Sequence, residues 1–88
     1  MAQPQVLIYV TDWCPYCARA RALLAAKGVT FSEIDVDAVP GARREMAARG
    51  GGDTVPQIFI GDRPVGGCDE LHALEAAGRL DPLLKNGA

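Results

Sequence analysis

The chain has 88 residues, 49% of them hydrophobic, which is enough for one packed domain spanning residues 1–88 and argues against disorder. Its formal net charge of -2 provides no basic surface field, so we expect no nucleic-acid partner. We also expect no membrane association, because no apolar run approaches the roughly 18 residues of a membrane-spanning helix. The expected class is a small globular protein that works as a monomer.

The cysteine content points to a reducing compartment. Three cysteines are an odd number, which does not suggest the paired disulfide framework of a small secreted protein. Residues 1–5 lack the basic start of a signal peptide, and the apolar stretch after them is too short for its hydrophobic core. We therefore expect a cytoplasmic protein whose thiols are reduced.

The first part of the chain predicts a strand, a helix and a second strand. Val6–Val10 is a continuous apolar run, which is typical of a strand buried on both faces. Pro15–Lys27 is rich in helix-forming residues, and a basic residue followed by Gly28 is typical of a helix end. Thr30–Val36 alternates and is predicted to be the next strand. Strand, helix and strand of these lengths form a βαβ unit, whose two strands run parallel.

A second helix is predicted after this unit. Asp37 is a suitable N-cap residue, and Arg43, Arg44 and Glu45 are expected to face water. A flexible glycine loop at residues 50–52 follows the helix. Apolar residues at helical spacing supply the expected buried side: Val39, Ala42, Met46 and Ala47.

The rest of the chain predicts a β-hairpin and two short helical segments. Gln57–Ile60 and Pro64–Val65 are the expected strands of the hairpin. A helix over Leu71–Ala77 and a final apolar turn over Leu80–Leu84 complete the chain. The element order β-α-β-α-β-β-α, with a short tail helix, predicts an α/β fold: a four-stranded mixed sheet flanked by helices.

The segment Cys14-Pro15-Tyr16-Cys17 lies where the first strand gives way to the first helix. The first N–H groups of a helix are unpaired and its dipole is positive there, so this position favours a thiolate over a thiol. Pro15 suits the first helical position, because its φ is preset and its missing N–H has no partner to lose. Residues three apart share one helix face, so the two sulfurs lie within disulfide reach. The pattern predicts thiol–disulfide chemistry at Cys14.

Three separated stretches resemble the active site and the glutathione site of dithiol glutaredoxins: Cys14–Cys17, Thr54–Ile60 and Gly66–Leu71. The closing stretch at residues 80–85 is similar to that of the small bacterial members, so the resemblance extends over nearly the whole chain. It implies a thioredoxin fold and an enzyme that uses glutathione as its electron-donating cosubstrate. The implied substrates are disulfide-containing and glutathionylated client proteins, and no metal is expected.

The resemblance also implies a role for individual residues. Cys14 corresponds to the nucleophile and Cys17 to the resolving cysteine. Glutathione would lie in a groove flanked by Tyr16, along the backbone of Val55, with its γ-glutamyl end at the segment around Cys68. The complete set of implied glutathione-binding residues is Tyr16, Thr54, Val55, Pro56 (with a cis peptide bond), Gly67, Cys68 and Asp69.

The sequence departs from this family at three places. Related proteins commonly carry a lysine three residues before the first cysteine and a basic or amide residue shortly before the T-V-P segment. Here these places hold Thr11 and Gly52, and Arg49 is the candidate to supply a cation to the groove instead. Trp13 replaces a smaller residue, and it can form a stacking surface for a partner protein.

Three alternatives remain open from the residues alone. One is a redoxin of the same fold that is reduced by thioredoxin reductase. Another is a module that holds an iron–sulfur cluster between two chains, which Pro15 disfavours. The third is a zinc site built from Cys14, Cys17, Cys68 and His72. Otherwise we expect His72 to be a surface residue, Cys68 to serve through its backbone, and Asp69 to be a helix N-cap.

Overall fold

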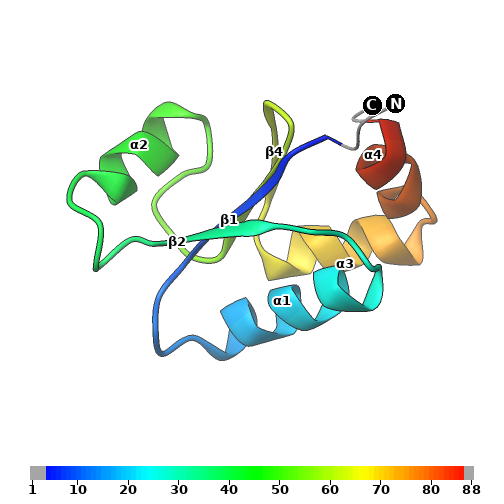
Figure 1. The fold of residues 1–88 in the computed structure, drawn as a ribbon, viewed down its shortest axis with the longest axis horizontal. Helices are drawn as coiled ribbons and strands as arrows, with labels where there is room; N and C mark the ends of the chain where they lie inside the picture. Colours follow the sequence, from blue (N-terminus) through cyan, green and yellow to red (C-terminus); the bar gives the residue numbers. More distant parts are fainter. Residues whose placement is uncertain (1–3, 87–88) are drawn as a thin grey trace.

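In the computed structural model, which describes residues 4–86, four strands form one mixed sheet in the order β2-β1-β3-β4 (Figure 1). Strand β1 (Val6–Val10) lies inside the sheet, parallel to β2 (Ser32–Asp35) and antiparallel to β3 (Gln57–Ile60). Strand β4 (Arg63–Gly66) completes the hairpin with β3 at the other edge. The parallel β1–β2 pair and the antiparallel hairpin are both as predicted.

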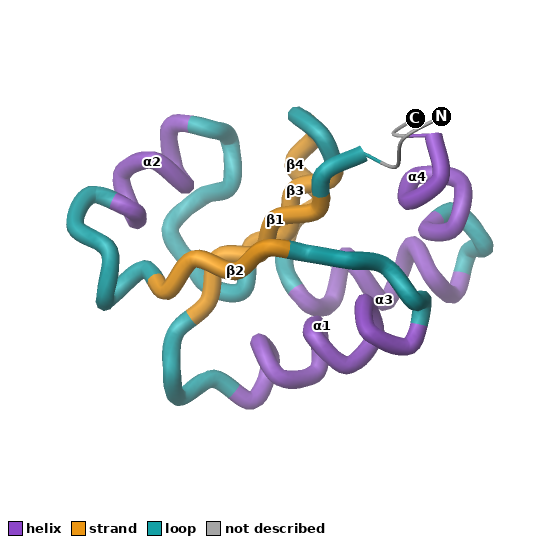
Figure 2. The backbone as a smooth tube through the Cα atoms, in the orientation of Figure 1, coloured by secondary structure: helices purple, strands orange, loops and turns teal. Residues whose placement is uncertain are grey.

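Helices cover both faces of this sheet (Figure 2). Helix α1 (Pro15–Ala26) and helix α3 (Cys68–Ala76) lie on one face, with α4 (Leu80–Asn86) beside α3. The shorter α2 (Ala42–Ala48) covers the opposite face. None of the helices within residues 4–86 has the length and apolar character that crossing a membrane requires.

Two hydrophobic clusters follow from the alternation along β1. Ile8 is fully buried on the face covered by α1 and α3, where it joins Leu24 and Leu71. Its neighbour Tyr9 is fully buried on the other face, where it joins Met46 under α2. Successive side chains of a strand point to opposite faces, so a central strand that contributes to both clusters must be apolar throughout. The prediction that Val6–Val10 is buried on both faces is confirmed.

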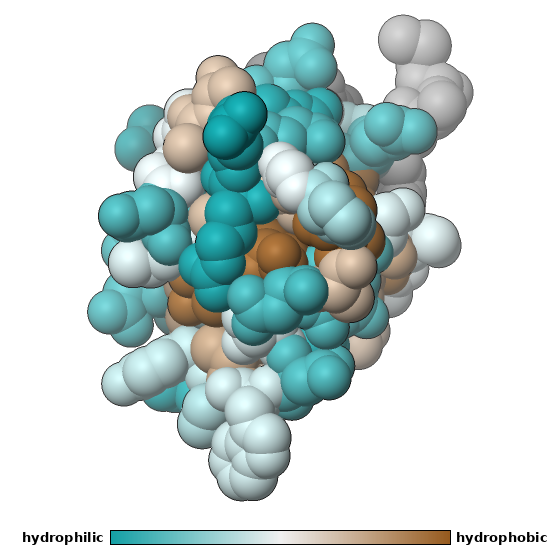
Figure 3. Space-filling model, turned by 90° about the vertical axis from the view of Figure 1, so that its left-hand side faces the viewer, coloured by the Kyte–Doolittle hydropathy of each residue, from teal (hydrophilic) through white to brown (hydrophobic). Residues whose placement is uncertain are grey.

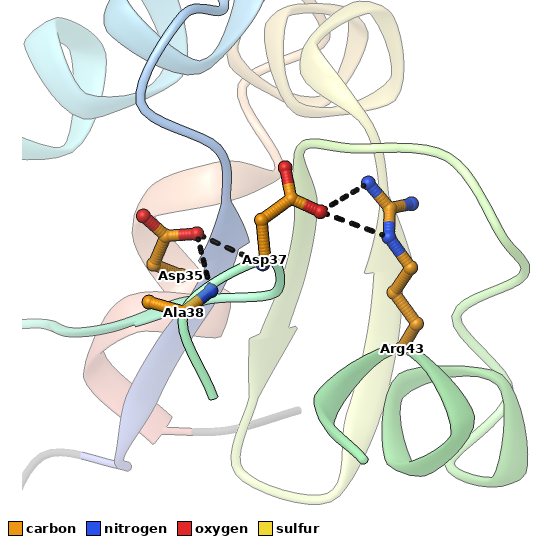
Figure 4. Close-up of polar contacts among 4 residues, drawn as sticks. All are labelled: Asp35, Asp37, Ala38 and Arg43. Carbon is orange, nitrogen blue, oxygen red and sulfur yellow. Dashed lines mark hydrogen bonds and ion pairs between the residues drawn. The ribbon is translucent and has the colours of Figure 1, made fainter. Parts of the chain in front are cut away.

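The start of α2 differs from the prediction. Asp37 does not cap the helix, which begins at Ala42 after Gly41. Asp35 stabilises the intervening turn instead: one of its carboxylate oxygens accepts the N–H groups of Asp37 and Ala38 at 2.9 and 3.2 Å (Figure 4). The Asp37 carboxylate pairs with Arg43, which fixes the turn to the first residues of the helix (Figure 4).

Because the helix starts later, fewer of its predicted apolar residues are buried. Ala42 and Met46, one helical turn apart, face the sheet as expected. Val39 precedes the helix and is exposed, and Ala47 lies on the outer side of the helix. The predicted burial of Val39 and Ala47 is therefore wrong.

Other element boundaries shift by a few residues. Strand β2 is shorter than the predicted Thr30–Val36, because only Leu7–Val10 of β1 pairs with it. Strand β4 is longer than Pro64–Val65 by one residue at each end. Helix α3 starts before Leu71, and this earlier start places its first turn beside the cysteine pair.

The glycine loop is more closely packed than a flexible connection. Gly51 is buried, and its N–H donates to the carbonyl of Met46 at 3.0 Å, which ends helix α2. A Cβ at this position would lie 2.8 Å from the ring of Phe59 and 3.0 Å from the Met46 carbonyl oxygen. Only glycine allows the chain to pass between α2 and the sheet without displacing them.

We therefore expect Gly51→Ala to lower the free energy of unfolding by about 1–3 kcal/mol through overpacking. Ala48→Ser, at the exposed last residue of α2, is the matched control and should change the stability by less than about 0.5 kcal/mol. Urea denaturation measures both variants. A Gly51→Ala protein as stable as the wild type would contradict the close packing.

Candidate active site

Cys14 occupies the N-cap of α1, immediately after the loop that follows β1. Its backbone is extended, with φ -148° and ψ 104°, and its sulfur accepts the N–H of Cys17 at 3.2 Å. Pro15 is the first residue of the helix, as predicted. The half-buried Cys14 sulfur therefore meets an unpaired helix N–H and the positive end of the helix dipole, both of which stabilise negative charge.

Cys17 is the inner member of the pair and is fully buried. Burial, together with the hydrogen bond to Cys14, raises the pKa of Cys17 to about 11. The two sulfurs are free thiols. Near neutral pH, Cys17 is therefore a protonated, shielded thiol, while Cys14 is the thiol that solvent contacts.

A groove lies beside Cys14. The Cys14 thiol points to the carbonyl oxygen of Val55, 3.9 Å from the sulfur, and the Val55–Pro56 peptide bond is cis, as predicted. Val55 lines a cavity of about 190 Å³. All the residues that the sequence suggested for glutathione lie around this cavity, together with Glu70: Tyr16, Thr54, Val55, Pro56, Gly67, Cys68 and Asp69. Three segments distant in sequence therefore meet beside the Cys14 sulfur.

The first turn of α3 forms the far wall of the groove. The N-cap is Gly67, not Asp69, so the predicted capping role of Asp69 is wrong. Glu70 performs part of this role, because its carboxylate accepts the Gly67 N–H at 2.8 Å. A glutamate three residues after the N-cap is a known helix-start pattern, and this signal could have identified Glu70 from the sequence. Asp69 is left exposed at the edge of the groove.

Cys68 and His72 contact each other on α3. Cys68 is buried, and burial raises the pKa of its thiol. His72 is half-buried rather than on the surface, with Nδ1 at 2.9 Å from the Cys68 carbonyl oxygen and 3.4 Å from its sulfur. Within residues 4–86, no three His, Cys, Asp or Glu side chains are grouped closely enough to hold a metal ion.

Arg49 does not supply the groove with a cation. Its guanidinium donates to the hydroxyl of Tyr9 at 3.2 Å and lies 5.5 Å from the ring centre of Phe59. Tyr9 in turn donates to Glu45 at 3.0 Å. These contacts attach α2 to the sheet face opposite α1 and α3, so the expectation that Arg49 faces the groove is wrong.

A cysteine pair at the start of the first helix, on a sheet of this order, is typical of thiol–disulfide oxidoreductases with a thioredoxin fold. The glutaredoxin family model matches residues 6–65. The chain is 60% identical over 81 residues to a glutaredoxin of Pseudomonas aeruginosa, covering 92% of this chain and 96% of that protein. The chain belongs to the glutaredoxin family and is a thiol–disulfide oxidoreductase.

Solved structures agree with the fold. The solution structure of a glutaredoxin from Brucella melitensis is similar over 100% of this chain and 96% of its own, with a TM-score of 0.87 and 57% identity. A buckwheat glutaredoxin–glutathione complex is similar over 93% of this chain and 76% of its own, with a TM-score of 0.84 and 28% identity. The predicted thioredoxin fold is confirmed.

The three cysteines differ in burial, since Cys14 is half-buried and Cys17 and Cys68 are buried. This difference predicts selective alkylation. With a pKa of about 11, only about one Cys17 in ten thousand is a thiolate at pH 7. Iodoacetamide at pH 7 should therefore modify Cys14 first and leave Cys17 and Cys68 unmodified. Mass spectrometry of proteolytic fragments identifies the site, and labelling in urea is the control that modifies all three. Modification of Cys17 as fast as Cys14 would contradict the described geometry.

Proposed function

We propose that this protein uses glutathione to reduce protein disulfides and protein–glutathione mixed disulfides. The observation that carries the proposal is the groove beside Cys14, because a thiol of general reactivity would need no shaped site next to it. Support also comes from the similar buckwheat protein, whose structure is a complex with glutathione. The odd number of cysteines does not suggest the paired disulfides of a small secreted protein, so the reaction is proposed for the cytoplasm, with the protein acting as a monomer.

The walls of the groove match the chemistry of the tripeptide. The backbone of Val55 offers strand-like pairing to an extended peptide whose cysteine faces Cys14. The N–H groups at the start of α3, around Cys68, suit the α-carboxylate of the γ-glutamyl residue. The exposed carboxylate of Asp69 suits the ammonium group beside it. Tyr16 flanks the opening.

The first route needs Cys14 alone. Its thiolate attacks the glutathione sulfur of a protein–glutathione disulfide, the old S–S bond breaks, and the client leaves as a thiolate. Glutathione is now bonded to Cys14. A second glutathione thiolate attacks its sulfur, releasing oxidised glutathione and regenerating the Cys14 thiolate.

The second route adds Cys17. Cys14 attacks a client disulfide and forms a mixed disulfide, and Cys17 then attacks the Cys14 sulfur and releases the reduced client. The product is a Cys14–Cys17 disulfide, which two glutathione molecules reduce. Cys17 must lose its proton in this step, and its N–H already contacts the Cys14 sulfur, so the two residues are adjacent when it does.

The two routes are separated by cysteine variants. Cys14→Ser should abolish both reactions, because it removes the nucleophile. Cys17→Ser should retain reduction of a small glutathione mixed disulfide but lose protein disulfide reduction by at least about 100-fold, since the intramolecular step is gone. Turnover is measured with glutathione, glutathione reductase and NADPH.

Two results would contradict this account. Loss of both reactions in Cys17→Ser would rule out the one-cysteine route. Full turnover with thioredoxin reductase in the absence of glutathione would favour a redoxin that needs no glutathione groove.

The absence of a lysine at position 11 gives a further prediction. Thr11→Lys places a cation just before the active-site loop, where it can pair with the glycyl carboxylate of glutathione. The KM for glutathione should fall about two- to fivefold, the range of an exposed ion pair. Thr30→Lys is the matched control, because residue 30 precedes the end of β2 that is remote from Cys14. Gly52 is unsuitable for this test because its φ is +76°. An unchanged KM in Thr11→Lys would contradict the placement of the glycyl carboxylate near residue 11.

A further inference from the structure

Two large aromatic side chains stand in solvent beside the reactive sulfur. Trp13, immediately before Cys14, is 91% exposed, and Tyr16, two residues after it, is 56% exposed. The site otherwise buries its apolar side chains, including Cys17. A tryptophan exposed to water forgoes the favourable free energy of burying its ring, and tryptophan is enriched at the centres of protein interfaces. The expected stacking surface at Trp13 is therefore fully available to a partner.

The segments around these aromatics are acidic. Residues 11–16, 53–56 and 67–70, segments that each contribute at least one lining residue to the groove, contain four carboxylates and no lysine or arginine. All four are exposed: Asp12, Asp53, Asp69 and Glu70. Arg19, further along α1, offsets part of this negative charge. It lies close enough to the groove for its positive charge to counteract the rise in the pKa of Cys68. The rim of the active site is therefore negative on balance.

Neighbouring arginines are already paired with other acids. Arg21 on α1 forms an ion pair with Glu33 on β2, and Arg43 on α2 pairs with Asp37 in the turn after β2 (Figure 4). Asp12, next to Trp13 and exposed, lies within hydrogen-bond reach of the Asp35 side chain, so two acidic groups stand beside the aromatic surface, and the nearby Arg21 offsets part of their charge. Figure 3 shows the side of the molecule that carries the β1–α1 loop and α2: hydrophilic side chains cover most of it, around a smaller hydrophobic area.

We propose that Trp13 and Asp12 bind a lysine or arginine side chain of the client protein, close in sequence to the client cysteine whose disulfide is reduced. This inference rests on the proposed function and names the clients that the same site prefers. A cation over the face of an indole is attracted by its ring, and an adjacent carboxylate strengthens the contact. The acidic rim also attracts a basic segment during encounter and repels an acidic one.

The negative charge of the rim disfavours other occupants of the surface around Trp13. A second copy would bring the same acidic rim against itself, and an anionic lipid surface would also be repelled. A basic protein segment is the occupant whose charge and side-chain chemistry complement both the indole and the carboxylates. Glutathione itself does not occupy this surface, because the residues around its proposed groove do not include Trp13.

The test uses three peptides of one length, each with a single glutathionylated cysteine flanked by lysine and arginine, by serine, or by glutamate. Release of the free peptide is followed at saturating glutathione and at low ionic strength. The wild type should turn over the basic peptide with a kcat/KM about tenfold above that of the acidic one. This ratio should fall to about twofold in roughly 0.5 M salt, which screens exposed charges.

Variants assign the preference to the two residues. In Trp13→Ala and Asp12→Asn, the basic-to-acidic ratio should drop at least about threefold, each ratio being taken within one variant so that general losses cancel. Trp13→Phe retains an aromatic ring and should preserve more of the ratio than Trp13→Ala. Asp62→Asn removes an equal charge in the β3–β4 turn, at the far end of β3 from Val55, and should keep the wild-type ratio.

The outcomes separate this inference from the proposed function. Equal kcat/KM for the three peptides, with normal turnover of a small glutathione mixed disulfide, would overturn the client preference and leave the proposed function standing. A ratio lost equally in Asp62→Asn would overturn the assignment to Trp13 and Asp12. No glutathione-coupled turnover of any substrate, the small disulfide included, would contradict the proposed function and the inference together.

Discussion

The chemistry of this protein depends on one contact, the N–H of Cys17 donating to the sulfur of Cys14 at 3.2 Å. It requires a helix that begins at Pro15, so that Cys14 is the N-cap and its sulfur faces the unpaired end of the helix. It also requires the buried strand β1 to end where it does, since the short loop after Val10 delivers Cys14 to that position. The same contact keeps the two thiols of the proposed second route side by side, while burial keeps the inner one protonated.

The two faces of the sheet support this contact in different ways. On one face, α1 and α3 pack over Ile8 and hold the start of α1 against the first turn of α3, so the groove has two fixed walls. On the other, α2 is attached through Tyr9 and Arg49, and the glycines after it lead into the loop that carries Val55. The layer formed by α1 and α3 thus positions the Cys14 sulfur. The layer formed by α2 leads the chain to Val55, whose backbone forms another wall of the groove. In the proposed function, the first layer supplies reactivity and the segments around the groove select glutathione and client.

Patterns that depend on neighbouring residues were predictable from the sequence. The apolar run of β1, the Pro15 helix start and the hairpin after Pro56 each rest on local chemistry, and all are present. The set of groove residues was predictable through family resemblance, because no local rule brings Val55 next to Cys14. The errors have two sources. One is local: the Asp35 carboxylate accepts the N–H groups of Asp37 and Ala38 in the turn before α2, and Asp37 does not cap the helix. The other is a tertiary contact, because Arg49 donates to Tyr9 on β1 and does not face the groove. The close approach of Gly51 to Phe59 has no local signal either.

The most direct test of the central claim is to locate glutathione on the protein. The Cys17→Ser variant, incubated with oxidised glutathione, should retain one glutathione in disulfide linkage to Cys14, and peptide mapping by mass spectrometry identifies the modified cysteine. In the ¹H–¹⁵N spectrum of this adduct, the backbone signals that shift most, apart from those of Cys14 and its sequence neighbours, should belong to Val55, Cys68 and Asp69, the walls of the groove. Attachment to Cys68 instead of Cys14, or attachment to Cys14 without shifts at those three residues, would contradict the account.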